Sequence, residues 1–188
     1  MLYIGGLRIS EALGLNVTSF EGNSQFPAFG EYGYINVYFG KGSKGSGKKH
    51  RKVPVTHPAL PQLLDWYVKN IYPELMANAD ANETALFLSE RGNRMGRSTA
   101  EARFHHALDL ADLEGRGFTP HSMRHSSVTH ESLRLSLEAN RLKHGHVYAA
   151  TTQGYMHISD DMVREETNNV ISKQLNQFKD KPTEGESK

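Results

Sequence analysis

The feature that most constrains this chain is a pair of strand-like segments that flank a run rich in glycine and lysine. Residues 35–39 (INVYF) and 52–55 (KVPV) have the β-branched and aromatic composition typical of strands. The lysine-rich run KGSKGSGKKHRK, from Lys41 to Lys52, predicts the long loop of a β-hairpin. One hairpin in a chain whose other periodic segments are helical predicts an α+β fold, mainly α-helical with a small antiparallel β-sheet.

Apolar residues recur at helical spacing in five other segments. The predicted helices cover 8–15, 58–71, 98–115, a segment that starts at Thr119 and Pro120, and 160–178. We expect a capping box, Ser98-Thr99-Ala100-Glu101, to begin the third helix and Gly115 to close it. Residues 85–89 (ALFLS) are predicted to form a short buried strand or extended segment.

Length and composition favour one domain without cysteine chemistry. A chain of 188 residues suits a single core, which we place at 1–179, with a disordered tail at 180–188. The absence of cysteine excludes disulfides, cysteine nucleophiles and thiolate-bound zinc. No apolar run reaches the length of a membrane span and the N-terminus does not resemble a signal peptide, so we expect no membrane partner. These features predict a cytoplasmic protein.

The distribution of charge is more informative than its total. The formal net charge is only +1, yet the run from Lys41 to Lys52 holds six Lys and Arg residues and no acid. A charge run by itself is most often a solvated hairpin tip. The alternative interpretation is a loop that neutralises the phosphates of a nucleic acid. The side chains predicted to contact DNA are Lys44, Lys48, Lys49, Arg51 and Lys52.

A second signal is the sequence HSMRH at 121–125, at the start of a predicted helix. His121 and Arg124 are three residues apart and share a helix face, so both can approach one anion. The alternative is an ordinary ion pair for Arg124 and a structural histidine. His121 and His125 have the spacing of a helical metal pair, but Arg124 between them would repel a cation. We therefore predict no metal site and no cofactor.

Four segments, in order along the chain, resemble the sequence boxes of the tyrosine recombinase (phage integrase) family. They are GGLRISEALGL at 5–15, YFGKGSKGSGKKHRKVPV at 38–55, TPHSMRHSSVTH at 119–130 and HGHVYAATTQGYMHIS at 144–159. His146 lies 22 positions after Arg124, and Tyr155 lies nine after His146, which suits the family pattern. The resemblance spans 2–159 and implies the fold of DNA breaking-rejoining enzymes, the integrase catalytic core.

The resemblance also implies a division of chemical roles. The phenol of Tyr155 attacks a DNA phosphodiester, and two guanidinium groups bind the non-bridging oxygens of that phosphate. Lys41 protonates the departing 5′-oxygen, His121 accepts or shares the tyrosine proton, and His146 donates a hydrogen bond to the phosphate. The full predicted catalytic set is Arg8, Lys41, His121, Arg124, His146 and Tyr155, with Glu11 and His125 as supporting residues.

Some positions leave alternatives open. The hairpin loop is longer than is usual in the family, so Lys44 rivals Lys41 as the general acid. Tyr148 is a second candidate nucleophile, although the family spacing favours Tyr155. His144 stands where the family frequently has leucine.

The predicted function is a site-specific DNA recombinase or integrase that forms a 3′-phosphotyrosine intermediate. Its predicted partner is double-stranded DNA, bound by a homo-tetramer because exchange between two duplexes requires four cleavages; the free protein is expected to be a monomer or weak oligomer. The alternatives are a type IB topoisomerase, an inactive DNA-binding remnant or regulator of a mobile element and, with least support, a histidine phosphatase. The family's N-terminal DNA-clamping domain is not recognisable, so we interpret the chain as a catalytic fragment. The sequence leaves open whether 162–175 packs in cis or on a neighbouring protomer.

Overall fold

The computed structural model describes residues 1–40, 49–145 and 160–179. Its α-helices are α1 (Ile9–Leu13), α2 (Ala59–Asn70), α3 (Tyr72–Met76), α4 (Arg97–Leu110), α5 (Pro120–Ser132), α6 (Leu137–His144) and α7 (Asp160–Lys179). A 3₁₀ helix, η1, covers Pro27–Tyr32. The strands β1 (Phe20–Glu21), β2 (Tyr34–Gly40) and β3 (Lys49–Pro54) form one antiparallel sheet in the order β1-β2-β3. The predicted α+β class and the hairpin are confirmed.

The register of the hairpin decides which side chains face the core. Ile35 pairs with Val53 and Val37 pairs with Arg51, so these four side chains lie on the same face of the sheet. Ile35 and Val53 are fully buried, and so is Val55 two positions further on. Arg51 therefore points to the interior, whereas its neighbour Lys52 points to the other face.

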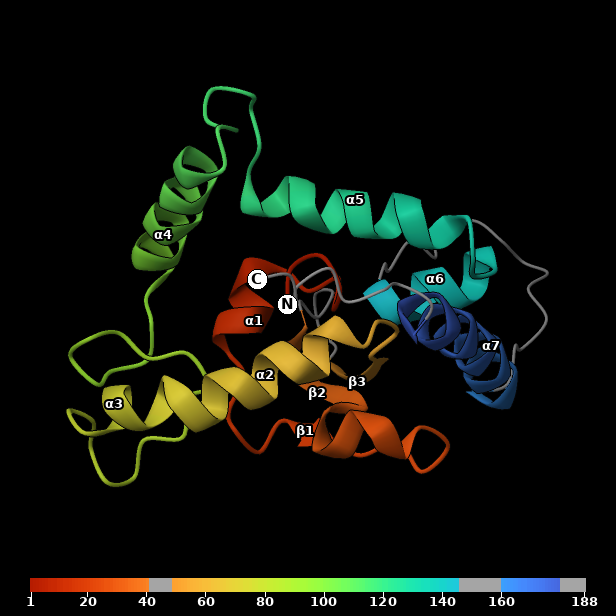
Figure 1. The fold of residues 1–188 in the computed structure, drawn as a ribbon, viewed down its shortest axis with the longest axis horizontal. Helices are drawn as coiled ribbons and strands as arrows, with labels where there is room; N and C mark the ends of the chain where they lie inside the picture. The colour runs from red at the N-terminus through yellow and green to blue at the C-terminus, as the bar shows by residue number, and fades with distance from the viewer. Residues whose placement is uncertain (41–48, 146–159, 180–188) are drawn as a thin grey trace, which may run out of the picture.

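The helices cover this sheet unevenly (Figure 1). α1 packs against β2 and α6 packs against β3, while Leu60 and Leu64 of α2 join the same core as the strands. α5 runs across the top of the view and α7 lies beside α6. α4 stands away from the sheet at the upper left of the view. Of its residues, Leu108 alone is buried. Residues of α1, α4 and α5 together line one cavity.

The start and end predicted for α4 are wrong. The helix begins at Arg97 with Gly96 as its N-cap, and no side chain caps it. Gly96 adopts the extended N-cap conformation, φ −76° and ψ 157°, so Ser98 falls inside the first turn and cannot begin a capping box. The helix ends at Leu110, and Gly115 lies in a later turn with φ +73°.

The predicted start of α5 is confirmed. Thr119 accepts a hydrogen bond from the backbone N–H of Ser122, and Pro120 occupies the first turn. α6 was not predicted from the sequence. Its N-cap Ser136 accepts from the N–H of Ala139, and Gly145 ends it in the left-handed conformation, φ +59°.

α7 matches the helix predicted at 160–178 and packs on its own chain. Ile171 is fully buried in the main core, and Val170 packs with Leu135 and Ala139 in a smaller one. The backbone N–H of Ser136 donates to Glu166 of α7, at 3.1 Å. The tail predicted at 180–188 lies outside the described residues. Over the described ranges, no helix is long and apolar enough to cross a membrane.

Candidate active site

Glu11 lies at the centre of a buried cluster of charged side chains. The residue is 2% exposed, and its carboxylate accepts four hydrogen bonds. Oε1 accepts from Nη1 of Arg8 at 2.7 Å and Nη1 of Arg51 at 2.8 Å. Oε2 accepts from the backbone N–H of Arg8 at 2.8 Å and Nη2 of Arg51 at 2.9 Å. These bonds occupy the four acceptor positions of the carboxylate.

Arg8 occupies the N-cap position of α1, and Glu11 is the third residue of that helix. The same carboxylate therefore caps the backbone of the helix and orients the guanidinium of Arg8. The Arg8 side chain is 32% exposed. Within the described part of the chain, one of its five N–H groups is used by Glu11, which leaves donors for a ligand.

Arg124 projects from α5 into the same cluster and is 3% exposed. Its guanidinium donates to the backbone carbonyl oxygens of Gly6 and His144, and its Nη1 lies 3.7 Å from Oε2 of Glu11. The pKa of Arg124 is lowered to about 10, first by burial and then by the charge of Arg8, while the charge of Glu11 opposes the shift. Arg124 is thus protonated near neutral pH, and its position is fixed by two backbone segments.

Gly6 is required where it stands because its backbone is left-handed, with φ +57°. A Cβ atom at this position would lie 2.3 Å from Nε2 of His144. The absence of a side chain lets the ring of His144 pack against the same turn whose carbonyl holds Arg124.

One cavity brings together the two predicted arginines and His121. Its volume is about 550 Å³, and Arg8, Glu11, His121 and Arg124 line it together with residues of α4. His121 is exposed in the first turn of α5, one turn before Arg124. The ring of His125 meets that of His121 edge to face, with centroids 4.3 Å apart. The four cavity residues named first come from the start of α1 and from α5, which are more than a hundred residues apart in sequence.

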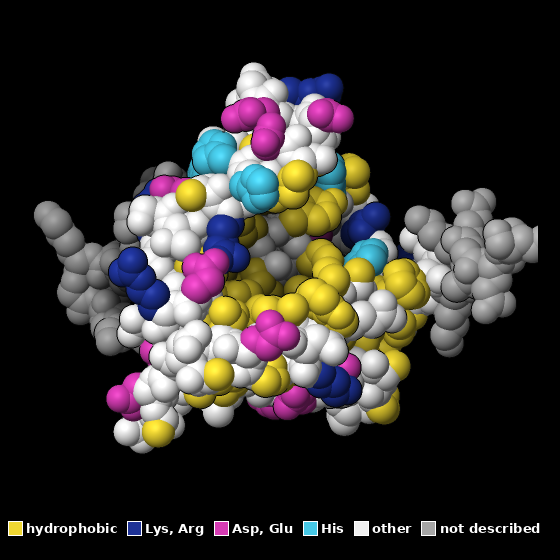
Figure 2. Space-filling view, turned by 60° about the vertical axis from the view of Figure 1, so that its left-hand side comes forward, with side chains coloured by type: hydrophobic (Ala, Val, Ile, Leu, Met, Phe, Trp, Pro, Cys, Tyr) yellow, Lys and Arg dark blue, Asp and Glu magenta, His cyan; other side chains and the backbone are white. Residues whose placement is uncertain are grey.

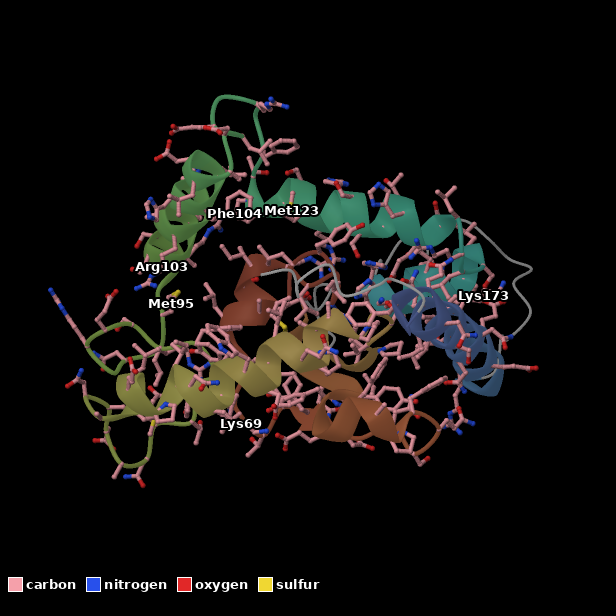
Figure 3. All side chains as sticks on the ribbon, viewed as in Figure 1. Lys69, Met95, Arg103, Phe104, Met123 and Lys173 are labelled. Atoms are coloured by element: carbon pink, nitrogen blue, oxygen red, sulfur yellow. The ribbon has the colours of Figure 1, made fainter. Side chains whose placement is uncertain are left out.

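The surroundings of α4 are visible in two views. Figure 2 shows a hollowed face, with hydrophobic side chains inside the hollow and histidine and Lys or Arg side chains around it. In Figure 3 the labelled Phe104 of α4 lies on the side toward α5, where Met123 is labelled. Residues Arg97, Glu101 and His105 of α4 line the cavity that holds Arg8. α4 thus forms one wall of the candidate active site.

Three predicted catalytic residues lie outside the described ranges. They are Lys41, His146 and Tyr155, and the rival residues Lys44 and Tyr148 also lie there. The described backbone stops at Gly145, directly before His146. The roles assigned to these residues stay predictions from the sequence.

The basic residues predicted to contact DNA divide between the two faces of the hairpin. Lys52 lies on the outer face, where its Nζ is 2.6 Å from Oε1 of Glu21 and 4.3 Å from the centre of the Tyr34 ring. Arg51 lies on the inner face, where its guanidinium binds Glu11. Lys48 and the side chain of Lys49 fall outside the description. The inward position of Arg51 was missed, although its period-two alignment with Val53 and Val55 is a signal of it.

A second buried cluster lies behind Arg124. Nζ of Lys143 donates to Glu131 and, at 3.1 Å, to Oγ1 of Thr56. Burial lowers the pKa of Lys143, while the charge and hydrogen bond of Glu131 oppose that shift. His144 is fully buried; its Nδ1 donates to the carbonyl of Asn140 at 2.9 Å, and its Nε2 is 3.1 Å from Oγ of Ser127. His144 therefore has an interior, structural position.

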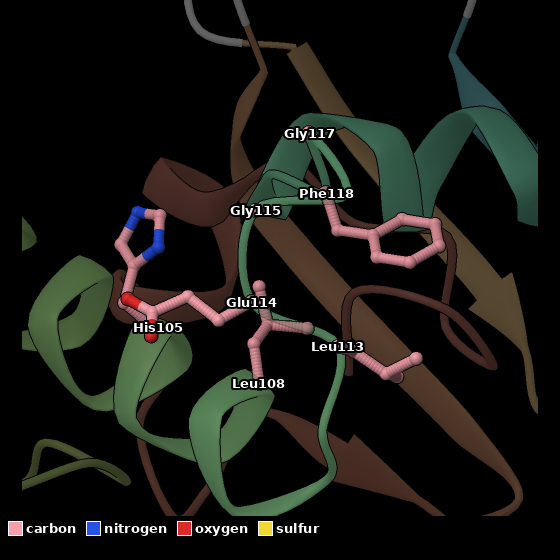
Figure 4. A pocket seen from close by; sticks show the side chains of 7 residues that line it. All are labelled: His105, Leu108, Leu113, Glu114, Gly115, Gly117 and Phe118. Carbon is pink, nitrogen blue, oxygen red and sulfur yellow. The ribbon is translucent and has the colours of Figure 1, made fainter.

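A second hollow, between α4 and the loop after it, does not suit a phosphate (Figure 4). Its lining residues are His105, Leu108, Leu113, Glu114, Gly115, Gly117 and Phe118. Among the residues that the structure describes, this lining has no arginine or lysine, and it contains the carboxylate of Glu114, which repels anions. Among the described residues there is also no group of three or more His, Asp or Glu side chains that could hold a metal ion.

Comparison with known sequences decides the family. The model of the phage integrase family matches residues 1–162 of this chain. The chain belongs to the phage integrase family. The match includes α1, the sheet, α5 and α6, which carry all of the described cluster around Glu11.

The sequence relatives of this phage integrase family member include Xer recombinases. Tyrosine recombinase XerC of Alcanivorax borkumensis is 35% identical over 162 residues, which cover 84% of this chain and 46% of XerC. Tyrosine recombinase XerD of Mycobacterium tuberculosis is 31% identical over 170 residues, which cover 88% of this chain and 48% of XerD. The chain spans about half the length of these relatives.

Solved structures agree on the fold of this family member. The XerA recombinase has a TM-score of 0.58 and 26% identity, covering 96% of this chain and 56% of XerA. The Tn1549 transposon integrase in complex with circular intermediate DNA has a TM-score of 0.56 at 23% identity, covering 88% of this chain and 54% of that chain. At 23% identity, the similarity to the Tn1549 integrase supports the fold and nothing further. The predicted integrase catalytic core fold is confirmed.

The cluster around Glu11 makes the stability of this integrase-family chain sensitive to acid. Burial raises the pKa of Glu11, but the hydrogen bonds and charge of Arg51, followed by those of Arg8, outweigh it and lower the pKa from 4.5 to about 2. Because the pKa of Glu11 is lower in the folded than in the unfolded chain, the ionised carboxylate stabilises the folded protein at pH values above 4.5. This stabilisation is lost as the pH falls from 4.5 to about 2. We expect about 3 kcal/mol of the free energy of unfolding to be lost there.

Urea titrations across this pH window test the expectation. Glu11→Gln should remove the pH dependence that belongs to this window and lower the free energy of unfolding near neutral pH by about 3 kcal/mol. Glu90→Gln is the matched control, because Glu90 pairs with Arg103 on the surface and its side chain is 75% exposed. An unchanged acid window in Glu11→Gln would show that the Glu11 cluster does not govern acid stability.

Proposed function

We propose that this chain is the catalytic part of a site-specific DNA recombinase that cleaves and rejoins strands through a 3′-phosphotyrosine intermediate, in DNA integration or excision. Residues 1–179 would form the catalytic domain, and double-stranded DNA would be its substrate. The observation that carries the proposal is the convergence of Arg8 and Arg124 around Glu11 at one open cavity. The relatives of this chain are named tyrosine recombinases, which supports the same reaction.

The charge of the cluster suits a phosphodiester. Arg8, Arg51 and Arg124 surround one carboxylate, so the net charge of the cluster is positive by two units. A phosphodiester carries one negative charge and gains a second in the pentacoordinate transition state. Because the guanidinium groups are held in place before DNA arrives, they stabilise the added charge without reorganisation. The planar fork of Arg8, which gives one side-chain hydrogen bond to Glu11, has further N–H donors that match phosphate oxygens.

The nucleophile and the proton transfers complete the reaction. Oη of Tyr155 attacks the phosphorus and forms a phosphotyrosine bond, while the bond to the 5′-oxygen breaks. His121, exposed at the cavity, accepts or shares the phenol proton, and Lys41 donates a proton to the departing 5′-oxygen. A phosphodiester is retained, so the 5′-hydroxyl of another strand can attack it and release the tyrosine. Neither a metal ion nor an energy-rich cofactor enters these steps.

Assembly and location belong to the same proposal. Exchange between two duplexes needs four cleavages, hence a homo-tetramer on DNA and a monomer or weak oligomer in its absence. Ile171 of α7 packs in the core of its own chain. We propose a cytoplasmic, nucleoid-associated protein, in keeping with a DNA substrate.

A covalent trapping experiment tests the proposed function. The chain is incubated with a pool of nicked duplexes of random sequence, in which the cleaved fragment diffuses away and the adduct persists. We expect a denaturation-resistant protein–DNA adduct that is lost on nuclease digestion and that contains phosphotyrosine. Relaxation of supercoiled DNA without joining of two sites would favour a topoisomerase. DNA binding without any adduct would favour an inactive DNA-binding remnant, and either outcome would contradict the proposal.

A further inference from the structure

We infer that Arg51 is a positioning residue of the active site, which acts through Glu11 to hold Arg8 in its catalytic orientation. The inference rests on the proposed function and adds a residue to it. Arg51 comes from the basic run of the hairpin, where sequence alone suggests a contact with DNA phosphates. Its inward contacts indicate a different role.

Arg51 binds Glu11 through both of its terminal nitrogens. Nη1 and Nη2 donate to Oε1 and Oε2 at 2.8 and 2.9 Å, which is the bidentate fork geometry of an arginine with a carboxylate. The Arg51 side chain is only 14% exposed, so water competes weakly for these bonds. Arg51 supplies two of the four hydrogen bonds that Glu11 accepts. Arg8 supplies the others, one of them from its backbone.

The bonds between Arg51 and Glu11 also affect Arg8, which shares the same carboxylate. Glu11 is buried among guanidinium groups and must be charged to hold them, and Arg51 provides the largest share of the interactions that lower its pKa. With two acceptor positions filled by Arg51, the carboxylate offers the Arg8 side chain a single hydrogen bond. Among the described residues, Glu11 is thus the one side-chain partner that orients the Arg8 guanidinium, whose other N–H groups can donate to the phosphate. Without Arg51, the carboxylate is free to take a second N–H of Arg8 and turn its fork away from the cavity.

Arg51 also joins parts of the chain that are far apart in sequence. Its Nε donates to the carbonyl of Lys143 at 3.2 Å, at the end of α6. A Cβ atom on Gly145 would lie 3.1 Å from Cδ of Arg51, so glycine permits this close approach. One side chain therefore connects the sheet, the Glu11 helix and the turn at Gly145. Arg124 is tied to the same turn through the carbonyl of His144.

The test separates positioning from a phosphate contact. In Arg51→Met we expect the single-turnover rate of adduct formation, at saturating duplex, to fall about 100-fold. The dissociation constant for the duplex should stay within about threefold, with an unchanged salt dependence. A phosphate contact would instead weaken binding and reduce the slope of log affinity against log salt by about 0.9, with the rate restored at saturating DNA. That second pattern would overturn the inference.

Further variants guard against a trivial loss of folding. Arg51→Lys keeps the charge but lacks the fork, so we expect about a tenfold lower rate with the melting temperature changed by only a few degrees. The double variant Arg51→Met/Glu11→Gln should form the adduct at a rate no more than about threefold below that of Glu11→Gln alone, because Arg51 acts on Arg8 through Glu11. If the double variant instead shows the product of the two single-variant rate losses, the inference is overturned. Arg103→Met, which removes an exposed arginine–glutamate pair, is the matched control and should leave the rate unchanged.

The outcomes also separate this inference from the proposed function. No adduct with the unaltered chain would contradict the proposed function itself. A normal adduct in the unaltered chain and an equally fast one in Arg51→Met would leave the proposed function intact and overturn the role of Arg51.

Discussion

Tyr155→Phe is expected to bind duplex DNA and to form no covalent adduct. The reaction joins the phenolic oxygen of Tyr155 to the 3′-phosphate, and phenylalanine has no atom that can replace it. Loss of a nucleophile lowers rates by roughly 10⁵-fold or more, which places adduct formation below detection. A single hydroxyl contributes about 1 kcal/mol to binding, so the affinity for DNA should change by less than about tenfold.

Tyr148→Phe is the matched control for this experiment, since Tyr148 is the rival nucleophile only seven positions away. It should form the adduct at close to the normal rate. Mass spectrometry of the nuclease-trimmed adduct should place the nucleotide on the peptide that contains Tyr155. An adduct retained in Tyr155→Phe and lost in Tyr148→Phe would reverse the assignment.

Arg124→Lys is expected to lower the rate of adduct formation by about 10³-fold at saturating DNA. The guanidinium of Arg124 spans two backbone carbonyls, those of Gly6 and His144, while it faces the cavity that holds Arg8. Lysine presents a single ammonium group and cannot hold both carbonyls and the phosphate together. The charge is conserved, so the affinity for DNA should change far less than the rate.

Arg124→Met separates catalysis from stability. This variant leaves the carbonyls of Gly6 and His144 without their donor and removes a charge near Glu11, so the free energy of unfolding should fall by about 3–5 kcal/mol. Arg103→Lys provides the comparison, because Arg103 forms an exposed pair with Glu90. This substitution should change neither the rate of adduct formation nor the free energy of unfolding. An Arg124→Lys rate within tenfold of normal would show that the phosphate is bound elsewhere.

Several elements could be predicted because their signals are local. The hairpin followed from β-branched residues on both sides of a glycine-rich run, and the start of α5 followed from Thr119 and Pro120. The start of α4 was missed because Ser98 and Glu101 satisfy a capping pattern locally, while the backbone of Gly96 sets the helix start in the folded chain. α6 was missed because its sequence, LEANRLKH, buries a lysine and a histidine where helices usually bury apolar residues.

The candidate site divides in the same way. Arg8, Glu11, His121 and Arg124 could be named from the sequence boxes, and the structure brings all four to one cavity. The alternation of Arg51 with Val53 and Val55 signals that Arg51 faces inward, but it does not identify the partner of its guanidinium. Only the packing of α1 on the same sheet brings Glu11 to Arg51.

The sequence by itself determined the α+β class, the hairpin, the residue types of the site and their order along the chain. These depend on local propensity and on chemistry that each side chain carries with it. The tertiary structure alone decided that Glu11 accepts four hydrogen bonds from Arg8 and Arg51, and that Arg124 is held by the carbonyls of Gly6 and His144. The physical reason is that a buried carboxylate and a buried guanidinium need partners, and folding draws those partners from segments far apart in sequence.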